Sequence, residues 1–542
     1  MQIKTRATRP IEGQKPGTSG LRKTTEVFSR PDFLQNYVQA IFNTIEPAGR
    51  TYIVGGDGRY FNDIAIAKIL RMAAANGVKK IIVGRGGLLS TPAASHLIRK
   101  YGTDGGFILS ASHNPGGPKG DFGLKYNTET GGPAAEAITD AIHAETQTLT
   151  EYHIAQEDAP EITEEGTFTL GNMTIEVVDP VADYADLMET LIDFDAIRDL
   201  ISRGFTLRFD AMHAVTGPYA VEILERRLGA KHGSVVNRRP SPDFGGGHPD
   251  PNPVWAKDLV DHMMVPDGPD FGAASDGDGD RNMIMGQGIY VTPSDSLAVI
   301  AANAHLAPGY ADGIAGIARS MPTSAAADRV AEALGIAAHQ TPTGWKFFGT
   351  LLDAGQVTIC GEESAGTGSS HVREKDGLWA VLLWLNIIAA RGQSVQQIME
   401  DHWGRFGRTY YSRHDYEAVD SDIAGTIMDD LRAALETLPG KSFAGLTVTE
   451  ARDFDYTDPV DGSTATSQGI ILGFEGGARA VLRLSGTGTQ GATIRLYLEN
   501  HEKPTGNLRQ DPQKALERVA RAADQIADLE KRTGRSAPDV VT

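Results

Sequence analysis

The chain has almost no cysteine and no long apolar run. Of its 542 residues only one, Cys360, is a cysteine, which excludes an intrachain disulfide and gives no sign of an oxidising compartment. The longest apolar stretch, 378–390, contains Asn386 and is shorter than the roughly 20 residues that a membrane-spanning helix needs. The first ten residues, MQIKTRATRP, lack the apolar core of a signal peptide. We therefore expect 378–390 to be a buried helix and the protein to be cytoplasmic.

The chain also has fewer basic than acidic residues. Lys and Arg total 51 against 70 for Asp and Glu, so the formal net charge is -19. A field of this sign repels nucleic acids and anionic membranes, and we expect neither as a partner. An anionic small-molecule substrate would need a locally basic pocket. Low-complexity tracts and blocks of five or more like charges are absent too, and the content of 40% hydrophobic and 22% charged residues is ordinary for a globular protein.

The chain is too long for one hydrophobic core and predicts three to five domains by the usual domain size. Strand and helix patterns alternate in its first third, with Asn62 placed to cap the first of two helices. The order β-α-β-α-β predicts a mostly parallel sheet. The expected strands are 51–54, 79–84 and 106–110, and the expected helices are 62–77 and 91–101.

Two further rounds of the same rhythm follow, and the pattern changes near residues 391–408. We predict an α/β protein of four domains, namely three related α/β domains with mixed sheets and a C-terminal α+β domain. The predicted boundaries are 1–180, 181–305, 306–393 and 394–542. The later elements expected are strands at 205–210, 271–274, 313–321, 357–359, 469–474, 479–484 and 492–498, and helices at 218–229, 294–306, 324–334, 375–390 and 511–532.

One stretch, 109–127 (LSASHNPGGPKGDFGLKYN), gathers chemically useful groups around a serine. An apolar strand leads to Ser112, and the Asn-Pro-Gly-Gly-Pro segment that follows forces a turn. Most clusters of this kind are plain turns. Here a hydroxyl, an imidazole and an ammonium group (Ser112, His113 and Lys125) lie within about a dozen residues, which favours phosphoryl or acyl transfer.

A second motif, residues 276–281 (DGDGDR), has carboxylates at alternate positions with glycines between them. Such clusters are more often solvated turns, but apolar strands enter and leave this one. An EF-hand is excluded because its sixth position holds Arg281 and its twelfth Gln287. Oxygen ligands alone suit a hard cation such as Mg²⁺.

A third motif, residues 483–491 (RLSGTGTQG), contains a literal G-x-G-x-x-G. A dinucleotide fingerprint opens a helix, whereas a strand pattern follows here, so that interpretation fails. A hairpin turn remains open. Backbone N–H groups and hydroxyls between Arg483 and Arg495 would also suit a phosphate dianion.

The remaining candidate groups are weaker on their own. Glu362 and Ser364 follow an expected strand and offer the acceptors and hydroxyl that grip a polyol, although carboxylates beside serine are also common at helix starts. Thr343 adds a loop hydroxyl, and residues 373–376 bring cations to the strand ends of the third domain.

Four motifs, SASHNPGG, SDGDGDRN, CGEESAGTGSSHVREKDGLWA and RLSGTGTQGATIRLY, in this order and spacing, resemble the α-D-phosphohexomutase family, and more closely its α-phosphoglucomutase branch. The likeness runs from Gly17 to Pro538. It implies a four-domain molecule with one loop from each domain around a central cleft. It also implies reversible interconversion of α-D-glucose 1-phosphate and glucose 6-phosphate through a phosphoserine enzyme and glucose 1,6-bisphosphate.

The resemblance assigns a role to each motif residue. Ser112 would carry the phosphoryl group, and its glycine-rich loop would let substrate and metal approach from opposite sides. One Mg²⁺ per chain would be bound by Asp276, Asp278, Asp280 and the phosphoserine. The other implied roles are proton transfer (His113, Lys125), lining of the cleft and substrate binding (Arg22, Asp280, Arg281), sugar binding (Thr343, Gly344, Glu362, Ser364, Lys375) and binding of the phosphate not being transferred (Ser485, Gly486, Thr487, Thr489, Arg495).

Several alternatives stay open at this point. A phosphomannomutase or dual-specificity enzyme fits the same motifs, and so does a non-catalytic relative that only binds, although such a protein would be expected to lose Ser112 or an aspartate. A phosphatase has no need of a second phosphate loop. A serine hydrolase is disfavoured because Ser112 lies outside a G-x-S-x-G elbow, and no Walker A pattern occurs. We expect sugar phosphates as partners and a monomer or weak dimer.

Overall fold

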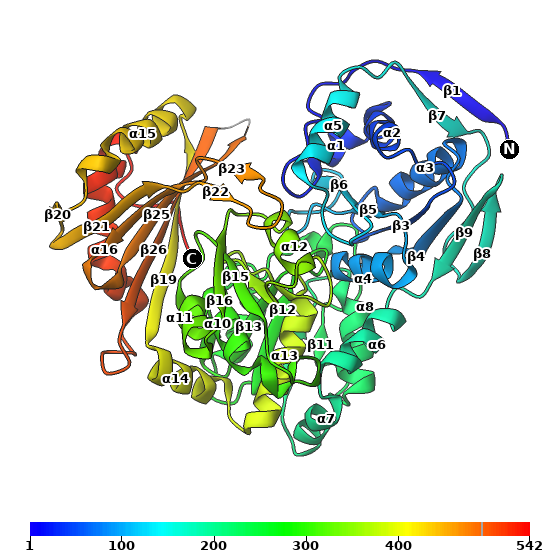
Figure 1. Cartoon of the computed structure of the whole chain (residues 1–542). Coiled ribbons are helices and arrows are strands. Elements are labelled where there is room, and N and C mark those ends of the chain that lie inside the picture. The colour runs from blue at the N-terminus through cyan, green and yellow to red at the C-terminus, as the bar shows by residue number, and fades with distance from the viewer. Residues whose placement is uncertain (489–490) are drawn as a thin grey trace. The chain divides into compact units, whose positions relative to one another are not determined.

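The structure, a computed structural model, describes residues 1–488 and 491–542, with side chains outside 486–490. The chain folds into two compact units (Figure 1). Unit 1 comprises residues 1–296, 302–315 and 344–396, and unit 2 comprises residues 297–301, 316–343 and 397–542.

The first sheet of unit 1 has seven strands in the order β2-β6-β5-β3-β4-β9-β8. Strand β3 runs parallel to both β4 and β5, which confirms the predicted β-α-β-α-β order, while β6 is antiparallel, so the sheet is mixed. An antiparallel ribbon of β1 and β7 lies beside helices α2 and α3. The strands are β1 (Ile3–Ala7), β2 (Leu21–Thr24), β3 (Thr51–Gly56), β4 (Lys80–Leu88), β5 (Gly106–Leu109), β6 (Asp121–Asn127), β7 (Glu151–Ala155), β8 (Gly166–Leu170) and β9 (Met173–Val178), and the helices are α1 (Thr25–Phe28), α2 (Phe33–Ile45), α3 (Asn62–Ala75), α4 (Thr91–Tyr101) and α5 (Glu136–Thr146).

The expected cap of α3 was wrong. Phe61, with a left-handed φ of 79°, occupies the cap position, and Asn62 is the first helical residue. The Asn62 side chain instead donates a hydrogen bond to the carbonyl of Gly87 at 3.3 Å. Because the chain turns sharply at Phe61, the Asn62 amide faces β4 rather than the free N–H groups of the helix. In contrast, Ser90 caps α4 by accepting from the N–H of Ala93 at 3.2 Å.

The second sheet of unit 1, in the order β11-β10-β12-β13-β14, is also mixed. The aspartate motif is the turn between the antiparallel strands β12 and β13. The helix expected at 218–229 is present as α8 followed by a π-helical segment, Val221–Arg227. The elements are β10 (Leu207–Asp210), β11 (Val235–Val236), β12 (Phe271–Ser275), β13 (Asn282–Gly286), β14 (Ile289–Val291), α6 (Ala182–Leu191), α7 (Phe194–Ser202), α8 (Thr216–Ala220) and α9 (Lys257–Met263). Helix α10 (Pro293–Asn303) follows, and its residues 297–301 are counted with unit 2.

Unit 1 also contains the hairpin of β17 (Ile359–Gly361) and β18 (Thr367–Ser369), helix α12 (Lys346–Asp353) and helix α13 (Gly377–Arg391). The strand expected at 357–359 therefore lies two residues later, where pairing with β18 begins. Helix α13 is buried over nearly its whole length, as its apolar sequence predicts. Among the described residues no single helix is long and apolar enough to cross a bilayer, and α13 meets that test only as a bent pair with α14 (Val395–Phe406).

Unit 2 contains the parallel pair β15 and β16, joined by α11, and a seven-stranded sheet in the order β20-β21-β24-β25-β26-β19-β27. The helix expected at 511–532 is broken at Asp528, whose left-handed φ of 53° separates α16 from α17. The elements are β15 (Gly316–Ser320), β16 (Ala337–Thr341), β19 (Arg408–Val419), β20 (Ser442–Phe443), β21 (Leu446–Asp453), β22 (Tyr456–Thr457), β23 (Thr464–Ala465), β24 (Ile470–Phe474), β25 (Arg479–Gly488), β26 (Gly491–Glu502), β27 (Val540–Val541), α11 (Ala326–Leu334), α15 (Ser421–Ala434), α16 (Pro512–Ala527) and α17 (Leu529–Thr533).

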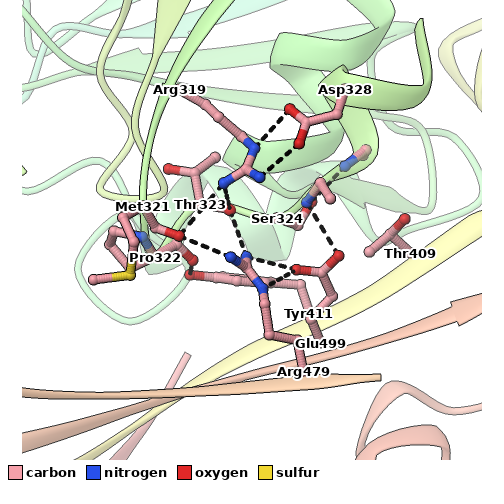
Figure 2. Close-up of polar contacts among 12 residues, drawn as sticks. Arg319, Met321, Pro322, Thr323, Ser324, Asp328, Thr409, Tyr411, Arg479 and Glu499 are labelled. Atoms are coloured by element: carbon pink, nitrogen blue, oxygen red, sulfur yellow. Dashed lines mark hydrogen bonds and ion pairs between the residues drawn. The ribbon is translucent and has the colours of Figure 1, made fainter. Parts of the chain in front are cut away.

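A polar network joins the two parts of unit 2 (Figure 2). Arg319, at the end of β15, donates to both oxygens of Asp328 at 2.7 and 2.6 Å and to the carbonyl of Thr323 at 3.0 Å. Arg479 of β25 donates to the same carbonyl at 2.8 Å, to that of Met321 at 3.0 Å, and to Glu499 of β26 at 2.7 Å. The turn after β15 is therefore held by two arginines, one from each part, which fixes the β25–β26 hairpin to it.

Candidate active site

Ser112 lies just beyond the end of β5 and is only 1% exposed. Its backbone has a left-handed φ of 52°, which is uncommon for a residue with a side chain. The hydroxyl donates to Asp276 Oδ2 at 2.7 Å, and His113 Nδ1 lies 3.5 Å from Ser112 Oγ. The structure thus brings together the serine and the aspartate motif, which are 164 residues apart.

A buried ion pair, Asp57 and Arg59, holds the serine loop in place. Arg59 Nη2 lies 2.9 Å from Asp57 Oδ2 and donates to the carbonyl of Ser112 at 2.7 Å, and Nη1 donates to that of Asp121 at 2.9 Å. Asp57 accepts from Ser110 Oγ at 2.6 Å, and Ser110 Oγ in turn accepts from the N–H of Ser112 at 2.7 Å. Sequence reasoning missed this pair, although a charged Asp-Gly-Arg turn directly after a buried strand was a usable signal.

The glycines of the serine loop pack closely on another part of the chain, and the role expected for them toward substrate and metal stays a prediction. A Cβ on Gly116 would lie 2.6 Å from the carbonyl oxygen of Pro242, and the N–H of Gly117 donates to that oxygen at 3.0 Å. These glycines let the loop pack on the segment near Pro242. The close approach to the metal motif occurs at Gly277, where a Cβ would lie 2.3 Å from the carbonyl oxygen of Ser112.

The three aspartates of the motif form a candidate metal centre. They are buried, and one carboxylate oxygen of each lies within 4.8 Å of the others. Asp276 Oδ1 accepts from the N–H of Arg281 at 3.0 Å, and Asp278 Oδ2 accepts from Thr91 Oγ1 at 2.6 Å. The Oδ1 atoms of Asp278 and Asp280 have no hydrogen-bond partner among the described residues. Since an unsatisfied buried carboxylate oxygen is costly, this set fits a divalent cation, and its all-oxygen character suits Mg²⁺.

The electrostatics of the three aspartates suit a bound cation. Burial, together with the charges of Asp280 and Asp278, raises the pKa of Asp276 well above its usual value. Burial also acts to raise the pKa of Asp278, but Lys125 and the Thr91 hydrogen bond act in the opposite direction, and the net pKa is lowered. Three buried carboxylates repel one another, and a bound cation would relieve that repulsion.

Four predicted cations lie around this centre. Lys375 Nζ is 3.3 Å from Asp280 Oδ2. Burial is the largest single influence and lowers the pKa of this amine, but the charges of Asp280, Glu362 and Asp276 together raise it, so the net pKa is raised and the amine stays charged. Lys125 Nζ donates to Glu374 Oε1 at 2.7 Å. The Nε atoms of Arg22 and Arg281 are buried and have no hydrogen-bond partner within the described part of the chain. These groups form the locally basic surroundings that an anionic substrate would need in a chain of negative net charge.

His113 is held in its neutral form. Burial is the main cause that lowers its pKa well below the usual value, and the charges of Arg281, Arg22 and Lys375 add to the effect. Near neutral pH the imidazole therefore has a free lone pair and can accept a proton.

The predicted sugar loop is the tip of the β17–β18 hairpin and adjoins the aspartate motif. Glu362 Oε1 accepts from the N–H of Gly344 at 3.0 Å, and the carbonyl of Ala365 accepts from the N–H of Asn282 at 3.0 Å. Burial raises the pKa of Glu362. Ser364 is half-buried at this tip. Thr343 belongs to unit 2, where it follows β16, and its Oγ1 is buried without a hydrogen-bond partner in the part of the chain that the structure describes.

The predicted phosphate loop lies in unit 2, at the end of the β25–β26 hairpin. Ser485 pairs with Thr493, and Arg483 pairs with Arg495 across the two strands. A strand and not a helix follows the glycines, which confirms that the G-x-G-x-x-G is no dinucleotide fingerprint. Thr489 and the side chain of Thr487 lie outside the described residues, and the phosphate-binding role expected for this loop stays a prediction.

Comparison with known proteins covers all four domains. Family models described as "Phosphoglucomutase/phosphomannomutase, alpha/beta/alpha" domains I, II and III match residues 13–153, 182–288 and 293–406, and one described as "Phosphoglucomutase-1, C-terminal domain" matches residues 408–539.

Individual relatives match over the full chain. Phosphoglucomutase of Rhizobium radiobacter is 61% identical over 541 residues, and phosphoglucomutase-1 of Homo sapiens is 50% identical over 562, with complete coverage of both chains in each case. The open form of pp63/parafusin, a phosphoglucomutase from Paramecium, has a TM-score of 0.93 at 46% identity and covers 100% of this chain and 99% of its own.

Proposed function

The chain belongs to the phosphoglucomutase/phosphomannomutase family, and from this premise we propose that it interconverts α-D-glucose 1-phosphate and glucose 6-phosphate, with Ser112 as the phosphoryl carrier. It is an isomerase of the phosphoglucomutase type. The observation that supports the role of Ser112 best is its buried hydroxyl, 2.7 Å from one of three convergent aspartates. No other arrangement of hydroxyl and carboxylates in the described residues offers both a nucleophile and a cation site.

The metal in this proposal is one Mg²⁺, held by Asp276, Asp278 and Asp280 together with the phosphoserine. When bound, the cation supplies positive charge that offsets the charge on the transferred phosphoryl group. The two carboxylate oxygens of Asp278 and Asp280 that have no partner among the described residues support this role, because a bound cation would satisfy both of them.

The chemistry assigned to the chain has two transfers. In the first, the O6–P bond of the sugar forms while the Ser112 Oγ–P bond breaks, and the proton of the O6 hydroxyl passes to a base. The product is glucose 1,6-bisphosphate, which must turn end for end. In the second, its 1-phosphoryl group moves to Ser112 Oγ, a proton returns to the sugar oxygen, and glucose 6-phosphate leaves.

The side chains around Ser112 support both transfers. Neutral His113, 3.5 Å from Ser112 Oγ, and Lys125 are the candidates for carrying the proton. Arg22, Arg281 and Lys375 would offset charge on the phosphoryl oxygens, since a loose transition state spreads negative charge over them.

The substrate would be held at two further places. Glu362 and Ser364, with Gly344 and Thr343, would bind sugar hydroxyls. The phosphate that is not being transferred would be bound by Ser485, Gly486, Thr487, Thr489 and Arg495. Glucose 1,6-bisphosphate must present both of its ends in turn, which is why a second phosphate site is part of the proposal.

A coupled assay tests the proposal by measuring glucose 6-phosphate formed from glucose 1-phosphate, with catalytic glucose 1,6-bisphosphate and Mg²⁺. Replacing Ser112→Ala should lower turnover by at least about 1,000-fold, because no hydroxyl remains to carry the phosphoryl group. Undiminished turnover in the alanine variant would contradict the assignment.

Mannose 1-phosphate as the substrate separates a dual-specificity enzyme from a glucose-specific one, and phosphate release without isomer formation would indicate a phosphatase. A cytoplasmic location and a monomeric or weakly dimeric state stay predictions.

A further inference from the structure

A groove of about 290 Å³ in unit 1 is lined by four cations. They are Lys4 and Arg6 of β1 and Lys68 and Arg71 of α3. No carboxylate is among the described residues that line it. In a chain with 70 acidic and 51 basic residues, a concave surface of one positive sign is unusual.

Simple periodicities explain how the fold gathers these cations. Lys4 and Arg6 alternate along β1 and therefore point to the same face of the β1–β7 ribbon, where their partners across the strands are Ile154 and Tyr152. Lys68 and Arg71 are three residues apart on α3 and share one face of that helix. Strand β7 packs on α3 and α2, so the two pairs of cations face a common space.

Three of the four cations are uncompensated. The side chains of Lys4, Arg6 and Lys68 form no ion pair or hydrogen bond within the described chain, and Lys68 lies only over the ring of Phe61 at 5.4 Å. Burial lowers the pKa of Lys68 and the charge of Asp32 acts against this, as expected for a positive charge without a close partner. Asp32 itself accepts from the Tyr152 hydroxyl at 2.8 Å.

The other polar groups of the groove are fixed in position. Arg71 donates to the carbonyl of Ala155 at 3.1 and 2.9 Å, and its carboxylate neighbour, Asp158 at 3.7 Å, is almost fully exposed. Gln35 Oε1 is buried and has no hydrogen-bond partner among the described residues. This oxygen has almost no accessible surface, so what the groove offers a ligand is its cations, which suit phosphate oxygens.

We propose that this groove is a binding site for a diphosphate group, separate from the catalytic centre around Ser112. The four cations recognise the phosphate oxygens, whether the diphosphate is free or part of an organic molecule. The site shares no lining residue with the catalytic centre and does not depend on the proposed isomerase activity.

Isothermal titration with two probes tests this site. Pyrophosphate measures the contribution of the phosphates alone, and ADP adds ribose hydroxyls. The double variant Lys4→Glu/Arg6→Glu should bind both probes at least about tenfold more weakly than the parent chain, because two attractive charges become repulsive. Turnover of glucose 1-phosphate should not change in this variant.

The matched control is Arg203→Glu/Lys231→Glu, which makes the same change in net charge at two exposed positions outside the groove. It should bind both probes as the parent does. An equal loss in the control, or no loss in the groove variant, would overturn the site. Absence of binding by both probes would also overturn the site, whereas binding of pyrophosphate without ADP would show that the groove takes the free anion. If the double variant does not fold, Lys68→Met provides the same comparison.

Discussion

At the scale of single residues, a protein hydrogen bond to one oxygen of an aspartate orients the other oxygen of the same carboxylate. Asp278 illustrates this, because Oδ2 is held by Thr91 while Oδ1 has no partner in the described structure. The hydrogen bond from Thr91 fixes the rotation of the carboxylate, so the unpaired oxygen keeps its direction. A ligand that is oriented in this way loses little entropy when it binds a cation.

Replacing Asp278→Asn removes one negative charge and keeps an oxygen for Thr91. We expect the variant to fold, to bind Mn²⁺ at least about tenfold more weakly and to lose most of its turnover. Electron paramagnetic resonance of Mn²⁺ measures the affinity independently of activity. Asp267→Asn is the control, since Asp267 is exposed and lies outside the motif. Equal Mn²⁺ affinity in the parent and the Asp278 variant would contradict the metal centre.

His96 of α4 makes stability depend on pH. Burial is the main cause that lowers its pKa from 6.5 to about 4, and Lys100 contributes. Between these values the unfolded chain binds more protons than the folded chain, so the free energy of unfolding decreases as the pH falls from 6.5 towards 4. This contribution to stability is fully present above pH 6.5.

The variant His96→Gln cannot take up this proton. We expect its free energy of unfolding to fall less between pH 7 and pH 5 than that of the parent, by on the order of 1 kcal/mol once the partial exposure of His96 is allowed for. Urea unfolding followed by circular dichroism at both pH values measures the difference. Parallel pH dependence in the two proteins would show that His96 is not the responsible group.

At the scale of elements, the serine loop and the aspartate turn touch through their backbones. A Cβ on Gly277 would lie 2.3 Å from the carbonyl oxygen of Ser112, and Arg59 donates to that same oxygen. The distance between the two loops is therefore set by the absence of a side chain at one position. Loop spacing of this kind controls the catalytic geometry, because small displacements of reacting groups are expensive.

The substitution Gly277→Ala should push the two loops apart. We expect turnover to fall by about 100-fold, with weaker Mn²⁺ binding and an unchanged fold by circular dichroism. Gly349→Ala is the matched control, since Gly349 lies inside α12, where a Cβ would meet nothing within 4 Å. Turnover of the Gly277 variant equal to that of the control would mean that the close approach does not matter.

The network of Figure 2 predicts a stability effect in unit 2. Among the described residues, Arg479→Met leaves the nearly buried carboxylate of Glu499 with one hydrogen-bond donor, the N–H of Ala325 at 3.1 Å. Removing one partner of a buried ion pair costs about 3–5 kcal/mol. We expect Glu499→Met to restore part of this stability when it is added to Arg479→Met. Hydrogen exchange of unit 2 peptides in urea measures both variants, and an additive loss in the double variant would contradict the pairing.

At the scale of the whole molecule, the chain has two compact units, each with a large apolar core. Two cores of this kind do not have to unfold together. We expect hydrogen exchange in rising urea to give one midpoint for peptides of unit 1 and a different one for peptides of unit 2. A single midpoint for all peptides would show that the molecule unfolds as one cooperative body.

The sequence predicted what depends on local pattern. Helix α4 has the expected bounds, and the four domains follow from alternating strand and helix signals together with motif order. What it could not predict depends on distant partners. Arg59 is important because it contacts a carbonyl 53 residues away, and the break at Asp528 follows from a backbone conformation that the amphipathic pattern does not encode. The glycines near Pro242 were predicted as loop residues, but their neighbours lie in another part of the chain.

The buried thiol of Cys360 in β17 makes the protein suitable for labelling at an introduced cysteine. As the sole cysteine of the chain, with 0% exposure, it is shielded from alkylating dyes in the folded protein. An exposed cysteine introduced into either unit would thus be the one reactive handle, without removal of a native residue. A fluorophore attached to such a cysteine could then follow the protein during turnover, because the buried native thiol would not take up the dye.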